Sequence, residues 1–479
     1  MHKLLISFVL FTMNIVFGNL IVSQPYELRI TEGGREWATE MIYDNGSVFI
    51  VGGSDSFIDG LDDHRPYFIK VSQNGDILWD RIIELDTEVI PSAAAQLNST
   101  RYLAAGNTLG SFNRQQHIYI ESINSTAGWE SWAEVYDDFF GSVNDLIVDE
   151  GNIYITGDYW EVDSEYEPRD FLMARFSSSG ELIWRIAFGD NDNERGLRLV
   201  VVDENHLMGF GIKSNEISGQ LETVYYKLNK DGELIWQGLL DYQSSIVCRD
   251  VLLGEDGFIY LSGEVYNGYR SLFVAKIDVS GEVIWVNEYG SNSNIYDARL
   301  YSQNDRLFLM GDREADTEYQ TEIVLFEINY EGIILCEKVV VESELSVIKT
   351  LEDFVITEEN ELFILASVTD VSTTIGYDRV IFIKKDESPD CIVNTFEETG
   401  GEYFVKVSTV GSNRLLIQTP EIIDSHIDVY DALGRRIDDA NWVLQKGANF
   451  VSISLRKGLN IVCISSNNGY MSSHKIINY

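Results

Sequence analysis

A pentapeptide of the form Gly-x-x-x-Trp recurs along this chain, and it limits the possible folds more than any other feature. Copies end at five tryptophans, and cysteines stand at the corresponding places of the last two: Trp79, Trp132, Trp184, Trp236, Trp285, Cys336 and Cys391. Successive copies are 53, 52, 52, 49, 51 and 55 residues apart. Seven copies at a period near 50 residues are typical of a repeat architecture, in which each copy builds one structural unit.

Residues 144–189 illustrate what one repeat builds. Short runs rich in β-branched and aromatic residues alternate with turns that contain glycine, which predicts four strands per repeat and no helix. A single four-stranded sheet leaves its faces exposed, whereas sheets repeated around an axis cover one another. The sequence therefore predicts an all-β protein with a seven-bladed β-propeller of four-stranded blades. The repeated tryptophan is expected to fill the wedge between neighbouring blades.

The two ends of the repeat region suggest how the ring closes. Residues 26–31 have the pattern of a strand without a blade of its own, so we expect them to pair with the third strand of the seventh blade. Near residue 400 the rhythm stops, and short alternating strands then predict a small Ig-like β-sandwich. The expected organisation is a signal peptide at 1–23, the propeller at 24–398, a linker at 399–406 and a C-terminal domain at 407–479.

The N-terminus and the net charge both bear on location and partners. A basic start and the apolar run at residues 4–17 are typical of a secretory signal, with a membrane anchor as the alternative. The formal net charge of −42 disfavours nucleic acid and anionic lipid surfaces as partners, but it is compatible with cations and neutral glycans. We expect a secreted protein whose mature chain does not insert into a membrane.

Cysteines and acidic loops are the candidate sites for disulfides and metals. Cys336 and Cys391 are expected on facing sheets roughly 10 Å apart, beyond the reach of a disulfide. We therefore expect four buried free thiols and no Cys or His metal site. Two acidic stretches, residues 190–194 and 55–63, have oxygen ligands that could hold calcium, although solvated loops are the alternative. No other cofactor is expected.

Two stretches carry resemblances to known families. The repeat, seen in Trp184-x3-Phe188-Gly189 and in 226–236, resembles the secreted β-propeller repeats of Bacteroidetes. The tail, through Ile427-Asp-Val-Tyr-Asp-Ala-Leu-Gly-Arg-Arg436, 455–462 and 475–477, resembles the type A C-terminal sorting domain of the type IX secretion system. This second resemblance implies a contact with the secretion machinery, export across the outer membrane, and release or surface attachment after removal of the domain.

The loop pattern points to one face as the binding face. Turns between first and second strands, and between third and fourth strands, are minimal, whereas connections between second and third strands are long. Binding residues usually lie on loops that a rigid scaffold holds. Aromatic side chains in or beside these connections are therefore the candidate ligand-binding residues: Tyr159, Trp160, Tyr166, Tyr266, Tyr269, Tyr319 and Tyr377.

No motif for catalysis is present in the sequence. The six histidines have no metal-ligand spacing, and the nucleophile-elbow, zinc-protease and phosphate-loop patterns do not occur. The leading interpretation is a non-enzymatic propeller that binds a glycan or protein ligand. The alternatives are a polysaccharide hydrolase or lyase that uses carboxylates in the propeller pocket, and a passive structural or matrix protein.

Overall fold

The computed structural model describes residues 26–30, 35–55, 64–83, 85, 87–109, 116–160, 169–189, 193–214, 219–290, 293–315, 320–370 and 378–385 of the repeat region. Toward the C-terminus it describes 406–409, 414–419, 423–431, 436–445, 447–453, 458–466 and 471–478. Every regular element in these ranges is a β-strand, which confirms the all-β prediction. None of these residues forms a helix that could cross a membrane.

Most sheets of the repeat region are four-stranded antiparallel meanders. The first consists of β2 (Arg35–Asp44), β3 (Ser47–Asp55), β4 (Arg65–Ser72) and β5 (Ile77–Ile82). Three later sheets repeat this order: β13 (Asn193–Val201), β14 (His206–Ser214), β15 (Leu221–Asn229) and β16 (Leu234–Leu240); β17 (Ser245–Leu253), β18 (Ile259–Asn267), β19 (Tyr269–Ile277) and β20 (Val283–Tyr289); β21 (Ile295–Gln303), β22 (Arg306–Glu314), β23 (Thr321–Asn329) and β24 (Ile334–Val341).

One sheet has seven strands because two repeats share a strand. It consists of β6 (Glu88–Asn98), β7 (Arg101–Leu109), β8 (His117–Asn124), β9 (Glu130–Asp149), β10 (Asn152–Tyr159), β11 (Asp170–Phe176) and β12 (Leu182–Phe188). The 20-residue strand β9 pairs with β8 through its first part and with β10 through its second part. The sequence predicted a separate strand from Asn144, whereas here the fourth strand of one repeat continues into the first strand of the next.

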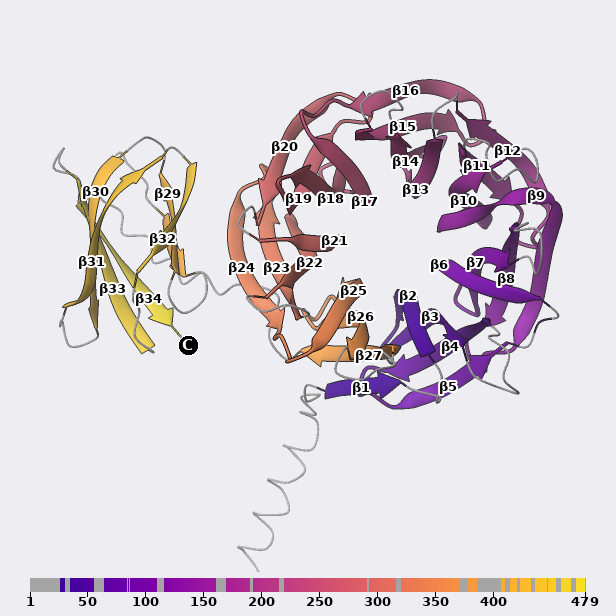
Figure 1. Cartoon of the computed structure of the whole chain (residues 1–479), viewed down its shortest axis with the longest axis horizontal. Coiled ribbons are helices and arrows are strands. Elements are labelled where there is room, and N and C mark those ends of the chain that lie inside the picture. Colours follow the sequence, from indigo (N-terminus) through magenta and orange to yellow (C-terminus); the bar gives the residue numbers. More distant parts are fainter. Residues whose placement is uncertain are drawn as a thin grey trace, which may run out of the picture.

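The N-terminal strand completes the last sheet. β1 (Tyr26–Ile30) runs antiparallel to β27 (Asp378–Lys385), which follows β25 (Val347–Ile356) and β26 (Leu362–Asp370). This confirms the predicted closing strand. Its register places Tyr26 opposite Lys384, just as Trp79 lies opposite Lys70 in the first sheet. Figure 1 shows these sheets around a common axis, with β2, β13, β17, β21 and β25 nearest to it, which is the arrangement of a β-propeller.

The repeated tryptophan of one repeat packs on the repeated glycine of the following repeat. A Cβ atom added to Gly232 would lie 2.9 Å from the Trp184 ring, and one added to Gly281 would lie 2.8 Å from the Trp236 ring. Both glycines have a φ of +91°, so they also occupy a backbone region that favours glycine. The same pairing occurs three more times, as Trp79 with Gly128, Trp132 with Gly180 and Trp285 with Gly332. The expected wedge filling is confirmed, although only Trp79 is fully buried.

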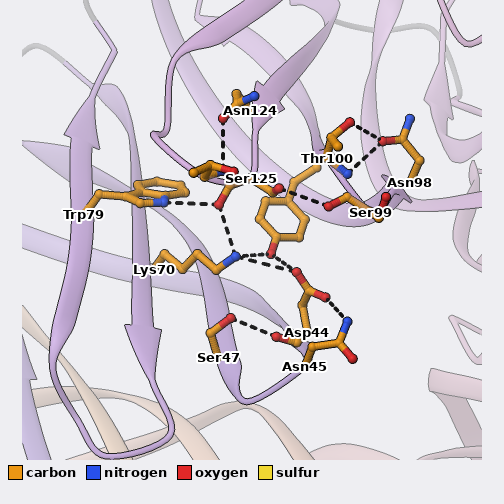
Figure 2. A network of polar contacts seen from close by, with 12 residues as sticks. Asp44, Asn45, Ser47, Lys70, Trp79, Asn98, Ser99, Thr100, Asn124 and Ser125 are labelled. Atoms are coloured by element: carbon orange, nitrogen blue, oxygen red, sulfur yellow. Dashed lines mark hydrogen bonds and ion pairs between the residues drawn. The ribbon is translucent and has the colours of Figure 1, made fainter.

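A basic residue strengthens this contact between sheets. The Lys70 ammonium and the Trp79 indole N–H both donate to the Ser125 carbonyl of the next sheet, at 3.0 and 3.3 Å (Figure 2). Arg175 and the indole of Trp184 donate in the same way to the carbonyl of Lys230, at 2.8 and 3.0 Å. The turns before Trp132 and Trp236 are thus each held by two donors from the preceding sheet.

Cys336 corrects one expectation from the sequence. It lies opposite Glu327, in the register that Trp285 occupies opposite Lys276, and it is buried but disulfide-bonded. The expectation of a free thiol is therefore wrong for Cys336, whose partner lies within the roughly 7 Å that a disulfide spans between Cα atoms. The cysteine that pairs with Cys336 is not among the described side chains. The side chains of Cys391 and Cys463 are also outside the described part of the chain. Cys248 is a buried free thiol, and burial raises its pKa to about 12.

The C-terminal residues form two further sheets. One consists of β28 (Lys406–Thr409), β29 (Arg414–Thr419) and β32 (Gly447–Ser452), and the other of β31 (Arg436–Leu444), β30 (Ile423–Asp431), β33 (Gly458–Ser466) and β34 (Met471–Asn478). Apolar side chains from both sheets make one buried cluster, which includes Leu415, Ile417, Ile427, Val429, Val451 and Val462. Two antiparallel sheets therefore pack face to face over a shared core.

Candidate functional site

The candidate binding face lies where second strands end and third strands begin. Most of the long connections fall outside the described residues, at 56–63, 110–115, 161–168, 215–218, 316–319 and 371–377. Three of the seven candidate aromatic residues, Tyr166, Tyr319 and Tyr377, therefore lie outside the described part of the chain. The other four are placed at two sheets: Tyr159 and Trp160 at the end of β10, and Tyr266 and Tyr269 at the hairpin of β18 and β19.

One of the expected long loops is a tight hairpin. The sequence predicted a loop at residues 264–270, but β18 continues to Asn267 and β19 starts at Tyr269, with Gly268 between them. Gly268 has a φ of +83°, which suits a sharp turn. Tyr266 lies opposite Arg270 in this ladder, and their side chains stack, so the pairing extends beyond the predicted strand end.

A Tyr–Arg–Tyr stack lies at this hairpin. The Arg270 guanidinium lies over the rings of Tyr266 and Tyr296, at 4.7 and 4.8 Å from their centres. Tyr296 donates to Glu314 at 2.5 Å, and the Arg270 backbone N–H donates to the Asn294 side chain at 3.0 Å. The two sheets that carry β18 and β21 are therefore joined at the binding face by an aromatic and cationic cluster.

Glu264 is the buried anchor of this cluster. Its carboxylate accepts from the Arg249 guanidinium at 3.0 Å, from the Tyr266 hydroxyl at 2.9 Å and from the Asp297 backbone N–H at 3.1 Å. Burial, together with the nearby Glu264, raises the pKa of both Tyr266 and Asp297. Tyr266 is consequently a fixed part of the protein framework, whereas Tyr269 is largely exposed beside it.

A second cluster surrounds Trp160. The Arg169 guanidinium lies 5.6 Å from the centre of the Trp160 ring and 2.9 Å from the Asp158 carboxylate. Arg195 of the next sheet reaches the same carboxylate at 3.0 Å, and the Asn144 amide donates to it at 3.2 Å. The Asp158 side chain is completely buried by these partners. Trp160 is half-buried, and its arginine neighbour is held in place from two sheets.

The carboxylates near the axis join neighbouring sheets. Each accepts a backbone N–H from an innermost strand of the next sheet: Asp353 from Met41 at 3.0 Å, Glu40 from Ala94 at 2.6 Å, Asp145 from Leu199 at 2.7 Å and Asp250 from Leu300 at 2.8 Å. Burial and neighbouring carboxylates raise the pKa of Glu40 well above its ordinary value, and burial raises that of Asp353 to about 6. These four carboxylates are thus structural links between neighbouring sheets.

The two stretches proposed for calcium lie mostly outside the described residues. Residues 190–192 and 56–63 lie outside the described ranges. Of the remaining residues, Asn193 accepts the Arg169 backbone N–H at 3.0 Å, and Glu194 binds Lys213 and Tyr226. In the part of the chain that the structure describes, no group of three or more His, Cys, Asp or Glu side chains could hold a metal ion.

Several residues of the two clusters were missed from the sequence. The main ones are the buried acids Asp158 and Glu264 and the arginines Arg169 and Arg270. A usable signal exists, because each acid directly follows the glycine that ends a second-strand phrase, as in Gly157-Asp158 and Gly263-Glu264. Each arginine stands within two residues of the start of a third strand. The cross-strand pairing of these positions cannot be read from composition.

Comparison with known proteins does not show a family for this chain. No family model and no curated protein matches the chain. Solved structures that resemble it include the β-propeller domain of the Trilobed protease from Pyrococcus furiosus, with 12% identity, 76% and 100% of the two chains covered and a TM-score of 0.45. Drosophila Semaphorin 1a extracellular domains 1-2 are 8% identical, with 75% and 88% of the two chains covered and a TM-score of 0.46. Phage phi92 endosialidase is 10% identical, with 95% and 90% of the two chains covered and a TM-score of 0.43. This likeness concerns the fold alone, and no statement about activity or partners follows from it.

Proposed function

We propose that this chain is a secreted or surface-displayed, non-enzymatic, seven-bladed propeller that binds a glycan or protein ligand through its loop-bearing face. The observation that carries the proposal is the pair of aromatic–arginine clusters at that face, around Trp160 and around Tyr266. Aromatic rings beside fixed charged groups are the usual composition of recognition surfaces for sugars and proteins.

The strand order supports the proposed count of seven blades. Five four-stranded sheets surround the axis, and the seven-stranded sheet contributes two units that share β9. These units are the seven proposed blades, and β1 is the outer strand of the last one. Blades of this kind cover both faces of every sheet and leave only short edges, which supports a rigid scaffold for the binding loops.

The C-terminal region is proposed as a separate Ig-like domain for export. Its two packed sheets support a sandwich over residues 407–479, after the propeller at 24–398 and a linker at 399–406. The resemblance of its sequence to type IX sorting domains supports a role in secretion, after removal of a signal peptide at 1–23. Mass spectrometry of the protein from a native host tests this: we expect a start near Gln24 and loss of the chain after about residue 400. An intact tail on periplasmic protein would contradict export.

A glycan array tests the binding face. The full chain, the double variant Trp160→Ala/Tyr269→Ala and the control Trp129→Ala are compared on neutral and anionic glycans. Trp129 is an exposed tryptophan in a short turn before β9, so it controls for the loss of a surface aromatic ring. We expect the double variant to lose binding while its melting temperature stays within about 1–2 °C, because neither residue is fully buried and such residues contribute little to stability.

The same array separates the alternatives. Release of reducing ends from a bound glycan would favour the hydrolase, and no binding to any glycan or to purified secreted proteins of the host would favour the passive structural role. Binding that the double variant keeps would place the function elsewhere on the protein.

A further inference from the structure

A groove with a volume of about 590 Å³ opens between β12 and the sheet of β13–β16. Its main lining residues are Phe188, Glu194, Lys213, Tyr226, Gln237 and Leu239. It adjoins the Trp160 cluster, because the backbone N–H of Glu194 donates to the carbonyl of Arg169 at 2.8 Å. The volume lies within the range of sites for small ligands.

The wedge between sheets at this groove is polar, whereas the next wedge is apolar. In the sheet of β17–β20, the corresponding wedge positions hold Ile246, Val265 and Ala275, which are all buried. In the sheet of β13–β16, the same register positions hold Glu194, Lys213 and Tyr226. A buried ion pair is seldom more stabilising than well-packed apolar residues of similar volume. The polar set is therefore poorly explained by packing alone.

The three polar side chains are mutually fixed. Lys213 donates to one oxygen of Glu194 at 3.0 Å, and the Tyr226 hydroxyl donates to the other at 2.8 Å. Glu194 is only 3% exposed. The Phe188 ring stacks on Tyr226 at a centroid distance of 4.4 Å and an interplanar angle of 11°. A carboxylate with four acceptor positions, held beside a rigid aromatic pair, is a prepared site for hydroxyl donors.

We propose that this groove binds a neutral oligosaccharide of two or three sugar units. Glu194 and Glu222 outnumber the single cation Lys213, which disfavours anionic ligands. Sugar hydroxyls can donate to the carboxylates and accept from Lys213 and Gln237, while the apolar face of a sugar ring packs on Leu239, which is 44% exposed. The inference rests on the proposed glycan binding and assigns it a defined subsite.

Isothermal titration calorimetry of the full chain tests the assignment. The probes are maltotriose, cellotriose, xylotriose, mannotriose and N-acetylchitotriose, with trigalacturonate as the anionic counterpart. We expect at least one neutral trisaccharide to bind and trigalacturonate not to bind. Gln237→Ala and Leu239→Ala should each weaken that binding roughly fivefold, the equivalent of about one hydrogen bond or buried methyl pair. The matched control is Ile235→Ala, an exposed residue on the same strand that does not line the groove.

The outcomes distinguish the groove from the wider proposal. If no neutral trisaccharide binds, or if Gln237→Ala and Leu239→Ala leave binding unchanged, the groove assignment is wrong. If Trp160→Ala/Tyr269→Ala abolishes trisaccharide binding that both groove variants keep, the loop-face proposal stands and the groove falls. If the groove variants weaken binding while the loop-face variant and Ile235→Ala do not, the groove is the sugar site and the loop-face proposal falls. An unchanged melting temperature in the groove variants shows that each result reports on binding.

Discussion

Replacing Trp79 by alanine tests the contact that joins successive sheets. The ring is 7% exposed, packs on Gly128 of the next sheet, and lies 5.8 Å from the Phe49 ring. Its N–H donates to the Ser125 carbonyl (Figure 2). The substitution removes the buried ring and leaves a cavity at the junction of the first two repeats.

The expected loss of stability is about 3–5 kcal/mol, the range for a buried aromatic residue replaced by alanine. The entropy of unfolding is about 2.1 cal/mol/K per residue, so unfolding a propeller of roughly 360 residues has an entropy change of about 0.75 kcal/mol/K. Dividing the two predicts a fall in melting temperature of about 4–7 °C. The fall in melting temperature is only a few degrees because a propeller of this size has a large unfolding entropy.

Differential scanning calorimetry of the wild type, Trp79→Ala and Trp129→Ala provides the measurement. Trp129 lies next to Gly128, is 65% exposed, and contacts the Arg81 guanidinium at 4.7 Å from its ring centre. Its removal should cost about 0.5–1 kcal/mol, or roughly 1 °C. Trp79→Phe keeps part of the ring and should fall between the two, which preserves the test if Trp79→Ala does not fold.

Equal melting temperatures for Trp79→Ala and Trp129→Ala would refute the reasoning. The repeated tryptophan would then be a surface residue whose recurrence has another cause. The packing of each tryptophan on the following glycine would no longer explain the repeat.

Three further predictions concern the ring. Gly281→Ala should lower the melting temperature more than Gly257→Ala in thermal-shift measurements. Both glycines have a positive φ, but only the methyl group added at Gly281 would meet another side chain, the Trp236 ring at 2.8 Å. Equal losses would count against this contact. Burial raises the pKa of Glu121 from 4.5 to about 8, so the folded protein favours the protonated carboxyl and loses stability as pH rises between these values. Glu121→Gln should therefore flatten the dependence of the melting temperature on pH between pH 6 and 9, and an unchanged profile would contradict this. Cys336→Ser should lose about 2–5 kcal/mol and become insensitive to reductant; a variant that reductant still destabilises would disprove the assignment.

Much of the fold could be predicted because the repeat encodes both partners of its main contact. Within one pentapeptide, the glycine contacts the preceding repeat and the tryptophan contacts the following repeat. The spacing of the pentapeptides along the chain therefore predicted the strand order and the closing strand. The continuous strand β9 and the hairpin at Gly268 were missed. In both places pairing continues through residues that look like loop, because side chains such as Arg270 and Tyr266 hold the two strands together.

The site was less predictable because it depends on contacts between sheets. Trp160 and Tyr269 could be chosen as loop aromatics, but nothing in the sequence pairs Asp158 with Arg195, which lies 37 residues later. In the sequence, Glu194 and Lys213 each fit the ordinary alternation of polar and apolar residues along a strand. Its unusual character appears only when it is compared with Ile246 and Val265 in the equivalent positions of the next sheet.

The pairing of β1 with β27 has a consequence for the order of events during folding. Strand β1 ends at Ile30, and its partner β27 begins at Asp378, so β1 pairs with a strand that is synthesised much later. Closing a loop of this length costs about 5 kcal/mol of chain entropy. The tryptophan contacts can form one after another as each repeat emerges, whereas this pairing has to wait. Until then the edge of β27 stays exposed, and the slowest and most aggregation-prone moment of folding falls at ring closure.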